Sequence, residues 1–105
     1  MLATGAFYFG EFNDNPLAPF NVSVASFDNS FLGESKHYHT HNQKVYIVFS
    51  GKGVLNVNGA QVEMSPETMI HIEPNDVHYL EKVLEAPLEF VVVLSSKIDD
   101  RVVIE

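Results

Sequence analysis

The segment HYHTH places His37, His39 and His41 at every second position of the chain. Alternate side chains of a β-strand point to the same face, so neighbouring members of this set can bind one ion together. Neutral imidazole is the commonest side-chain metal ligand, and a metal site needs several converging donors. The spacing therefore indicates a metal-binding site, with a solvated cluster of surface histidines as the alternative.

Two further histidines lie downstream of this segment. His78 comes shortly after Pro74 and Asn75, which favour a turn, and it begins another apolar segment. His71 lies in the middle of the segment MIHIE, where a structural or surface-facing position is expected. The chain thus offers His78 as a possible partner for the alternating histidines.

Short apolar segments, each followed by turn-forming residues, must position these histidines. They are rich in β-branched and aromatic residues, and they cover residues 20–27, 44–49, 53–57, 61–64, 68–72, 77–83 and 88–94. The pair Asn58-Gly59 between two of them is a strong hairpin signal. No window of about a dozen residues has helical periodicity. Turn signals every ~8–12 residues predict an all-β fold, either a sandwich or a barrel.

The composition limits what the protein can be. A chain of 105 residues is expected to form one domain over residues 1–105. Its formal charge is −8 and its six fixed cations form no cluster, which argues against binding to nucleic acid or to a membrane surface. Only one of these cations is an arginine, which counts against large phosphorylated substrates. There is no cysteine, so disulfides and thiolate chemistry are excluded. Without a membrane-spanning run or a recognisable signal peptide, a cytoplasmic protein is expected.

The amino-terminal segment, residues 1–20, is very aromatic for the edge of a domain. One interpretation is that it covers one end of the barrel. The other is that it supplies an exchanged or paired strand in a homodimer, since small barrels often protect their edges by dimerising. We expect a homodimer.

The motif region, residues 36–94, resembles the cupin superfamily. The first cupin motif has the form HxH, three or four residues, Glu, six residues and Gly, and the run HYHTHNQKVYIVFSG follows it from His37 to Gly51. The second motif ends in PxGxxH, and here EPNDVH ends at His78, with the proline moved by one position and Asn75 in place of glycine. Asparagine tolerates the left-handed backbone conformation better than most residues, so the turn can survive. The resemblance implies a double-stranded β-helix, or jelly-roll, barrel.

The resemblance also implies a ligand set. His37 and His39 match the two metal-binding histidines of the first motif, and His78 matches the histidine of the second. The glutamate of the first motif falls on Lys44, which is a departure. A charged ammonium has no lone pair to offer a metal, and it repels a divalent ion by about 3 kcal/mol per unit charge at ~5 Å and an effective dielectric constant of 20.

Three interpretations of Lys44 stay open at this point. Three histidines and water can hold the metal while Lys44 extends away toward the barrel mouth. A β-bulge can instead turn Gln43 or His41 inward as a fourth ligand, and some small cupins that act on uronate sugars resemble this chain in placing Gln near that position. Finally, the site can lack a metal and use its histidines and Lys44 as acid–base groups, like the cupins that isomerise or epimerise nucleotide-linked sugars.

The leading functional prediction is a metal-binding cupin that takes a small molecule, with a divalent nickel, zinc, manganese or iron ion as cofactor. Isomerisation, or related chemistry on a small sugar or organic acid, is the expected activity. Lys44 and Tyr46, which share one strand parity, are the expected proton-transfer residues. A ligand-binding or sensor cupin without activity and a metal-free sugar isomerase or epimerase are the alternatives, so the sequence leaves enzyme and binding module both open.

Overall fold

The computed structural model describes residues 20–96 and 98–104, together with the backbone of residues 6–9. Every regular element in this part of the chain is a β-strand. The strands are β1 (Ala6–Phe9), β2 (Asn21–Phe27), β3 (His37–His39), β4 (Lys44–Val57), β5 (Ala60–Met64), β6 (Met69–Ile72), β7 (His78–Leu94) and β8 (Arg101–Val103). The all-β prediction is confirmed, and no helix long and apolar enough to cross a bilayer occurs among the described residues.

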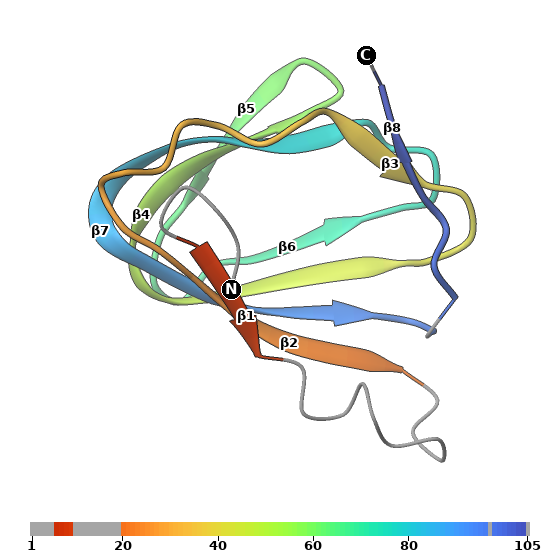
Figure 1. Cartoon of the computed structure of the whole chain (residues 1–105), viewed down its shortest axis with the longest axis horizontal. Coiled ribbons are helices and arrows are strands. Elements are labelled where there is room, and N and C mark those ends of the chain that lie inside the picture. The colour runs from red at the N-terminus through yellow and green to blue at the C-terminus, as the bar shows by residue number, and fades with distance from the viewer. Residues whose placement is uncertain (1–5, 10–19, 97, 105) are drawn as a thin grey trace.

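Two long antiparallel strands, β4 and β7, build both walls of a barrel (Figure 1). The first half of β4 pairs with the second half of β7, and these halves also pair with β6 and β2. The second half of β4 pairs with the first half of β7, and there β5 and β3 continue the sheet, with β8 beyond β3. This arrangement is the double-stranded β-helix that the sequence predicts.

Both long strands bend instead of ending in turns. The sequence predicted a turn at Ser50-Gly51, but β4 continues through it, with irregular pairing between Val48 and Leu55. Gly51 has a φ angle of 76°, and a Cβ atom there would collide with the carbonyl oxygen of Pro87 in β7. A bulge with a glycine in the left-handed region lets a strand turn a corner while staying paired, which is why the predicted turn was wrong.

Two predicted turns have the expected backbone. Asn58 and Gly59 both have positive φ angles, 51° and 90°, and they join β4 to β5 with Val57 opposite Ala60. Such a pair of left-handed residues matches the twist of a two-residue hairpin. Asn75 has a φ angle of 70°, so asparagine does replace the glycine of the second cupin motif in a left-handed turn.

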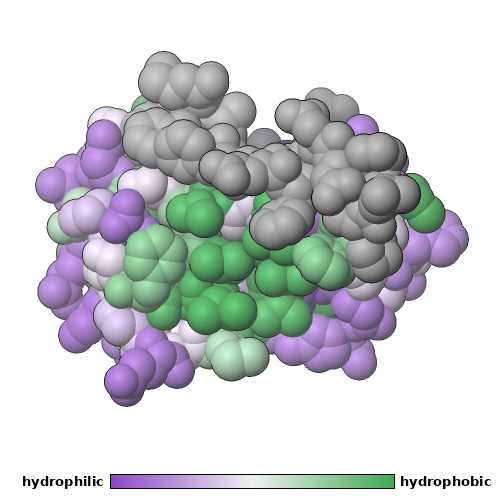
Figure 2. All heavy atoms as spheres, turned by 90° about the horizontal axis from the view of Figure 1, so that it is seen from below, coloured by the Kyte–Doolittle hydropathy of each residue, from purple (hydrophilic) through white to green (hydrophobic). Residues whose placement is uncertain are grey.

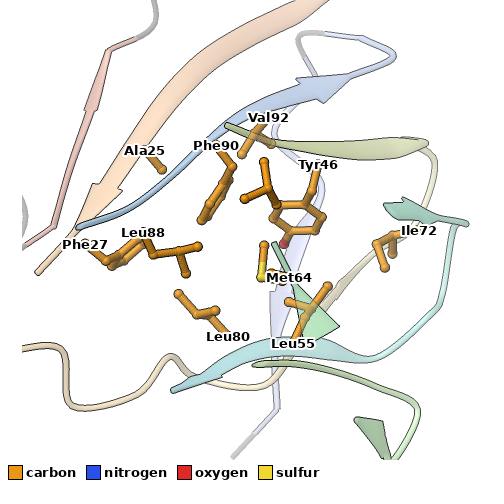
Figure 3. Packing of buried hydrophobic residues seen from close by; sticks show 11 residues of the cluster. Ala25, Phe27, Tyr46, Leu55, Met64, Ile72, Leu80, Leu88, Phe90 and Val92 are labelled. Carbon is orange, nitrogen blue, oxygen red and sulfur yellow. The ribbon is translucent and has the colours of Figure 1, made fainter. Parts of the chain in front are cut away.

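The hydrophobic core lies between the two walls (Figure 3). Leu55, Met64 and Leu88 are completely buried at its centre, and the aromatic rings of Phe27 and Phe90 stack with centroids 5.7 Å apart. Tyr46 packs edge-on against Phe90. The core fills one end of the barrel, so the polar residues described below lie beside a rigid apolar wall.

The outer face of the wall formed by β2, β7, β4 and β6 is also apolar (Figure 2). Its side chains form a row across four strands, from Val24 through Val91 and Ile47 to Met69. Ile47 and Met69 are 37% and 70% exposed. Met69 therefore faces outward, away from the core.

The amino-terminal prediction is only partly covered by the structure. The backbone of β1 pairs antiparallel with β2 of the same chain and lies at the edge of the sheet. The rest of the aromatic segment up to residue 19 lies outside the described residues.

Candidate functional site

Three buried histidines converge inside the barrel. His37 and His39 lie on the inward face of β3, and His78 begins β7 directly opposite His37. Their exposed fractions are 1%, 8% and 0%, and one nitrogen from each ring lies within 4.8 Å of the others. Three donors this close together could hold a metal ion.

The hydrogen bonds of the outer ring nitrogens fix the orientation of all three rings. The Nδ1 atom of His37 is 3.0 Å from the carbonyl oxygen of Ser35, and that of His78 is 2.8 Å from the carbonyl oxygen of Asp76. A carbonyl only accepts, so both Nδ1 atoms carry the proton and both Nε2 atoms keep a lone pair. The Nδ1 atom of His39 donates in the same way to Asp100 Oδ1, at 2.8 Å.

Lys44 lies directly beside two of these three histidines. Its Nζ atom lies 3.2 Å from His78 Nε2 and 3.4 Å from His37 Nε2, and the residue is only 8% exposed. The same ammonium lies 5.0 Å from the centroid of the Tyr46 ring. Two neutral imidazoles and one aromatic face therefore solvate a buried cation.

Burial and mutual repulsion keep this cluster at low charge. Burial and, after it, the positive charge of Lys44 lower the pKa of His37 and of His78 to about 3. Burial also lowers the pKa of Lys44 to about 8, although the Glu34 carboxylate opposes this shift. At neutral pH the cluster thus holds one protonated lysine between two neutral imidazoles.

A second buried network supports His39 from outside. Asp100 accepts hydrogen bonds from the side chains of His39 and Asn42 and from the backbone amides of His41 and Asn42. Burial tends to raise the pKa of this carboxyl group, but the four hydrogen bonds outweigh it and hold the pKa well below its usual range. Asn42, which is 1% exposed, also ties the segment at Ser96 to the histidine loop.

A cavity of about 170 Å³ gives access to the cluster. Its polar lining comes from four strands and the loop before β3, and consists of Ser23, Glu34, His37, His39, Lys44, Tyr46 and Arg101. Its apolar lining is Phe27, Leu80, Phe90, Val92 and Leu94. A mostly apolar hollow with a few convergent polar groups suits a small organic molecule.

The structure brings some of the sequence-predicted site residues together and separates others. Lys44 and Tyr46 both face the cavity, as their strand parity predicts. Gln43 faces outward and its Oε1 atom is 2.6 Å from Nε2 of the surface residue His71. His41 is exposed and lies beside Thr40. No bulge occurs at this start of β4, so neither Gln43 nor His41 is turned inward.

The position of Lys44 decides how well the site fits a divalent ion. Imidazole nitrogens bind such ions at about 2.0–2.1 Å through a lone pair. The lone pairs of His37 and His78 instead face an ammonium only 3.2–3.4 Å away. The lysine does not extend toward the barrel mouth, as one interpretation of the sequence required. The three imidazoles by themselves fit a divalent metal ion. With the Lys44 ammonium beside them, the site does not fit one.

Four residues of the site escaped the sequence analysis: Glu34, Asn42, Asp100 and Arg101. Arg101 carried a signal, because it is the only arginine of the chain. The other three have no distinguishing type or spacing. Asn42 and Asp100 belong to the site because the carboxyl-terminal segment returns to pair with β3, and Glu34 belongs to it because its backbone and side chain bond to Leu80 of β7.

Comparisons with solved structures agree on the fold. Streptomyces PAC13 with uridine is 18% identical, with a TM-score of 0.78 over 100% of this chain and 82% of the PAC13 chain. Pac13 is described as a nucleoside dehydratase. A Klebsiella pneumoniae protein with a double-stranded β-helix domain is 19% identical, with a TM-score of 0.82 over 100% and 89% of the two chains. A sugar phosphate isomerase of the cupin superfamily from Silicibacter pomeroyi is 21% identical, with a TM-score of 0.72 over 86% of this chain and 59% of its own.

The sequence identities to these solved structures are low, so the similarity shows the fold alone. The comparison with curated proteins found no match. Residues 28–94, which are more than half of the chain, match the family model of the cupin domain and include all three converging histidines and Lys44. On this match and on the barrel itself, the chain belongs to the cupin family.

Proposed function

We propose that this cupin catalyses proton transfer on a small sugar or organic acid, without a metal, as an isomerase or a related enzyme. The observation that carries the proposal is the buried ammonium of Lys44 between the Nε2 atoms of His37 and His78. In a metal-binding cupin the ion would polarise a substrate oxygen. Here Lys44 is a cation in the same position, and it can also give up a proton.

His39 is the proposed base of the reaction. Its Nδ1–H group donates to Asp100, so its Nε2 lone pair is free to take a proton, and the buried carboxylate stabilises the imidazolium that forms. His39 and Lys44 line the same cavity. The pair thus combines a base backed by a carboxylate with a cationic acid.

These roles balance for proton transfer next to a carbonyl group. His39 Nε2 takes the proton from the carbon beside the carbonyl, and the electron pair of that C–H bond forms the C=C bond of an enediolate. The carbonyl oxygen gains the negative charge, which the Lys44 ammonium stabilises and can neutralise by donating a proton. For an isomerisation, His39 returns its proton to the former carbonyl carbon, and the hydroxyl group on the neighbouring carbon gives its proton to neutral Lys44 and becomes the new carbonyl group. Loss of a β-hydroxyl group from the same intermediate, which leaves as water with the proton held on His39, gives a dehydration.

Elemental analysis and hydrogen exchange test the proposal. Protein purified without an affinity tag should contain far less than one transition-metal ion per chain. In D₂O it should exchange the C–H proton beside the carbonyl group of one member of a panel of aldoses, ketoses, uronates and sugar phosphates, monitored by proton NMR. Lys44→Met and His39→Gln should each slow the exchange by about 100-fold or more.

Lys82→Gln provides the matched control, because Lys82 is exposed and does not line the cavity. Its exchange rate should equal that of the wild type. One tightly bound metal ion per chain, or no exchange across the whole panel, would refute the proposal. The latter result would favour the non-enzymatic ligand-binding alternative.

A further inference from the structure

The carboxyl-terminal segment brings a second cation to the cavity. Arg101, in β8, lines the cavity together with Lys44. The formal charge of the chain is −8, and it has only six fixed cations. Four of these cations are lysines other than Lys44, and the structure describes three of them. These three are exposed and do not line the cavity: Lys36, Lys52 and Lys82. Two of the five fixed cations that the structure describes thus lie at the site.

Buried hydrogen bonds hold Arg101 in this position. Asp100, the preceding residue, is locked to the histidine loop by four hydrogen bonds. The strand that follows pairs with β3 so that Arg101 lies opposite His39. The network that orients the proposed base thus also places the arginine at the rim of the same cavity. A loosely attached tail would not be connected in this way.

The guanidinium group has no ion-pair partner among the described residues. The carboxylates at the site have other partners: Asp100 accepts four hydrogen bonds, and Glu34 Oε1 accepts one from the backbone amide of Leu80, at 2.9 Å. The field of Arg101 reaches the cluster, since its charge adds to burial in lowering the pKa of Lys44 and of His37. An exposed guanidinium at the rim of a largely apolar pocket is suited to bind a carboxylate or a phosphate through two parallel hydrogen bonds.

We propose that Arg101 forms an oxyanion subsite, so that the natural ligand is a small sugar or organic acid carrying a carboxylate or phosphate group. This inference rests on the proposed function, because it gives the substrate a charged end at Arg101 and a reacting end at Lys44. The match to the cupin domain ends at residue 94, so Arg101 lies beyond the part of the chain that the family model describes. The subsite is a feature of this chain's carboxyl-terminal segment.

Calorimetric titrations with three related sugars test the inference. Glucose is the neutral probe, glucuronate adds a carboxylate, and glucose 6-phosphate adds a phosphate. The wild-type protein should bind at least one of the two anions about tenfold or more tightly than glucose, and the better anion identifies the group that the subsite takes. Arg101→Gln should remove this preference by lowering the affinity for the anions far more than the affinity for glucose.

Lys82→Gln removes the same unit charge from an exposed position outside the cavity and should keep the wild-type preference. Circular dichroism checks that each variant is folded. The inference is overturned if glucose binds as tightly as both anions, if Arg101→Gln and Lys82→Gln behave alike, or if none of the three probes binds.

The two proposals fail in different ways. If the anions bind through Arg101 but Lys44→Met leaves proton exchange intact, the subsite stands and the proposed chemistry is wrong. If neutral and anionic sugars exchange at the same rate and Arg101→Gln has no effect, the chemistry stands and the subsite is wrong.

Discussion

The Nζ atom of Lys44 lies 3.2 Å from Nε2 of His78, a histidine that the second cupin motif supplies for a metal. Both His78 and His37 hold their Nδ1 protons against backbone carbonyl oxygens, as histidines in metal sites commonly do. The ligand geometry of a metal site is thus retained around an ammonium group. Among the four ligand positions that the cupin motifs imply, Lys44 is the one departure, and it is the natural target for mutation.

Lys44→Glu should create a metal site. The substitution replaces a repulsive charge with an anionic oxygen ligand, and both changes favour a divalent cation. We expect zinc or nickel to bind at least about 100-fold more tightly than to the wild-type protein, which corresponds to about 2.7 kcal/mol. Calorimetric titration gives both affinities. Lys82→Glu changes the net charge by the same amount on the surface and should leave the affinity unaltered. If Lys44→Glu binds the metal no more tightly than the wild-type protein does, the side chain at position 44 does not lie beside the histidines.

The stability of the protein should depend steeply on pH below neutrality. The pKa values of His37 and His78 are lowered to about 3 in the folded chain, whereas an unfolded histidine titrates near 6.5. Between these values the unfolded state binds more protons, so the free energy of unfolding should fall as the pH decreases from about 6.5 to about 3. The slope is at most about 1.4 kcal/mol per pH unit for each histidine.

The same linkage applies to Lys44 on the alkaline side. Its pKa is lowered from 10.5 to about 8, so the free energy of unfolding should rise as the pH increases between these values. Urea unfolding followed by circular dichroism measures both limbs. His78→Gln should flatten the acid limb, whereas His71→Gln, at an exposed position, should not. A wild-type stability that is constant from pH 4 to pH 6.5 would contradict the burial of neutral histidines.

Asp100→Asn should harm both stability and activity. The amide retains one acceptor oxygen but presents an NH₂ group where a carboxylate oxygen accepts from the backbone amides of His41 and Asn42. Losing these charge-assisted bonds should cost about 2–4 kcal/mol of unfolding free energy. The orientation of His39 also loosens, so proton exchange should slow by about 10- to 100-fold. Asp99→Asn, at an exposed neighbour, is the control, and equal effects of the two variants would exclude the proposed role of Asp100.

We propose that the protein is a homodimer through the apolar outer face of β2, β7, β4 and β6. Figure 2 shows apolar surface on this face. In the row from Val24 through Val91 and Ile47 to Met69, the side chains of Ile47 and Met69 are exposed, and a second copy can bury them. Light scattering at micromolar concentration should give twice the chain mass of 11.7 kDa.

The dimer prediction has a matched pair of variants. Ile47→Lys should give the monomer mass, whereas Leu84→Lys, at a similarly exposed position in the bent part of β7, should keep the dimer. A wild-type protein with the monomer mass would refute the prediction, and so would a dimer that survives Ile47→Lys unchanged.

The sequence by itself determined the features that depend on local spacing. Alternation in HYHTH put His37 and His39 on one face, because side chains of a strand repeat every two residues. The left-handed conformations of Asn58 and Asn75 followed from the types of residue that tolerate them. The cupin motifs also placed His78 correctly opposite His37, since a family pattern records pairings that no local rule contains.

Only the tertiary structure decided what these residues surround. Strand parity shows that Lys44 faces inward. Whether its long side chain ends at the barrel mouth or among the histidines depends on His37 and His78, which are 7 and 34 positions away in the chain. The Ser50-Gly51 pair signals a turn locally, yet strand pairing across the barrel makes it a bulge within β4. Asp100 and Arg101 belong to the site because β8 returns to β3, and such long-range pairing has no signature in the local sequence.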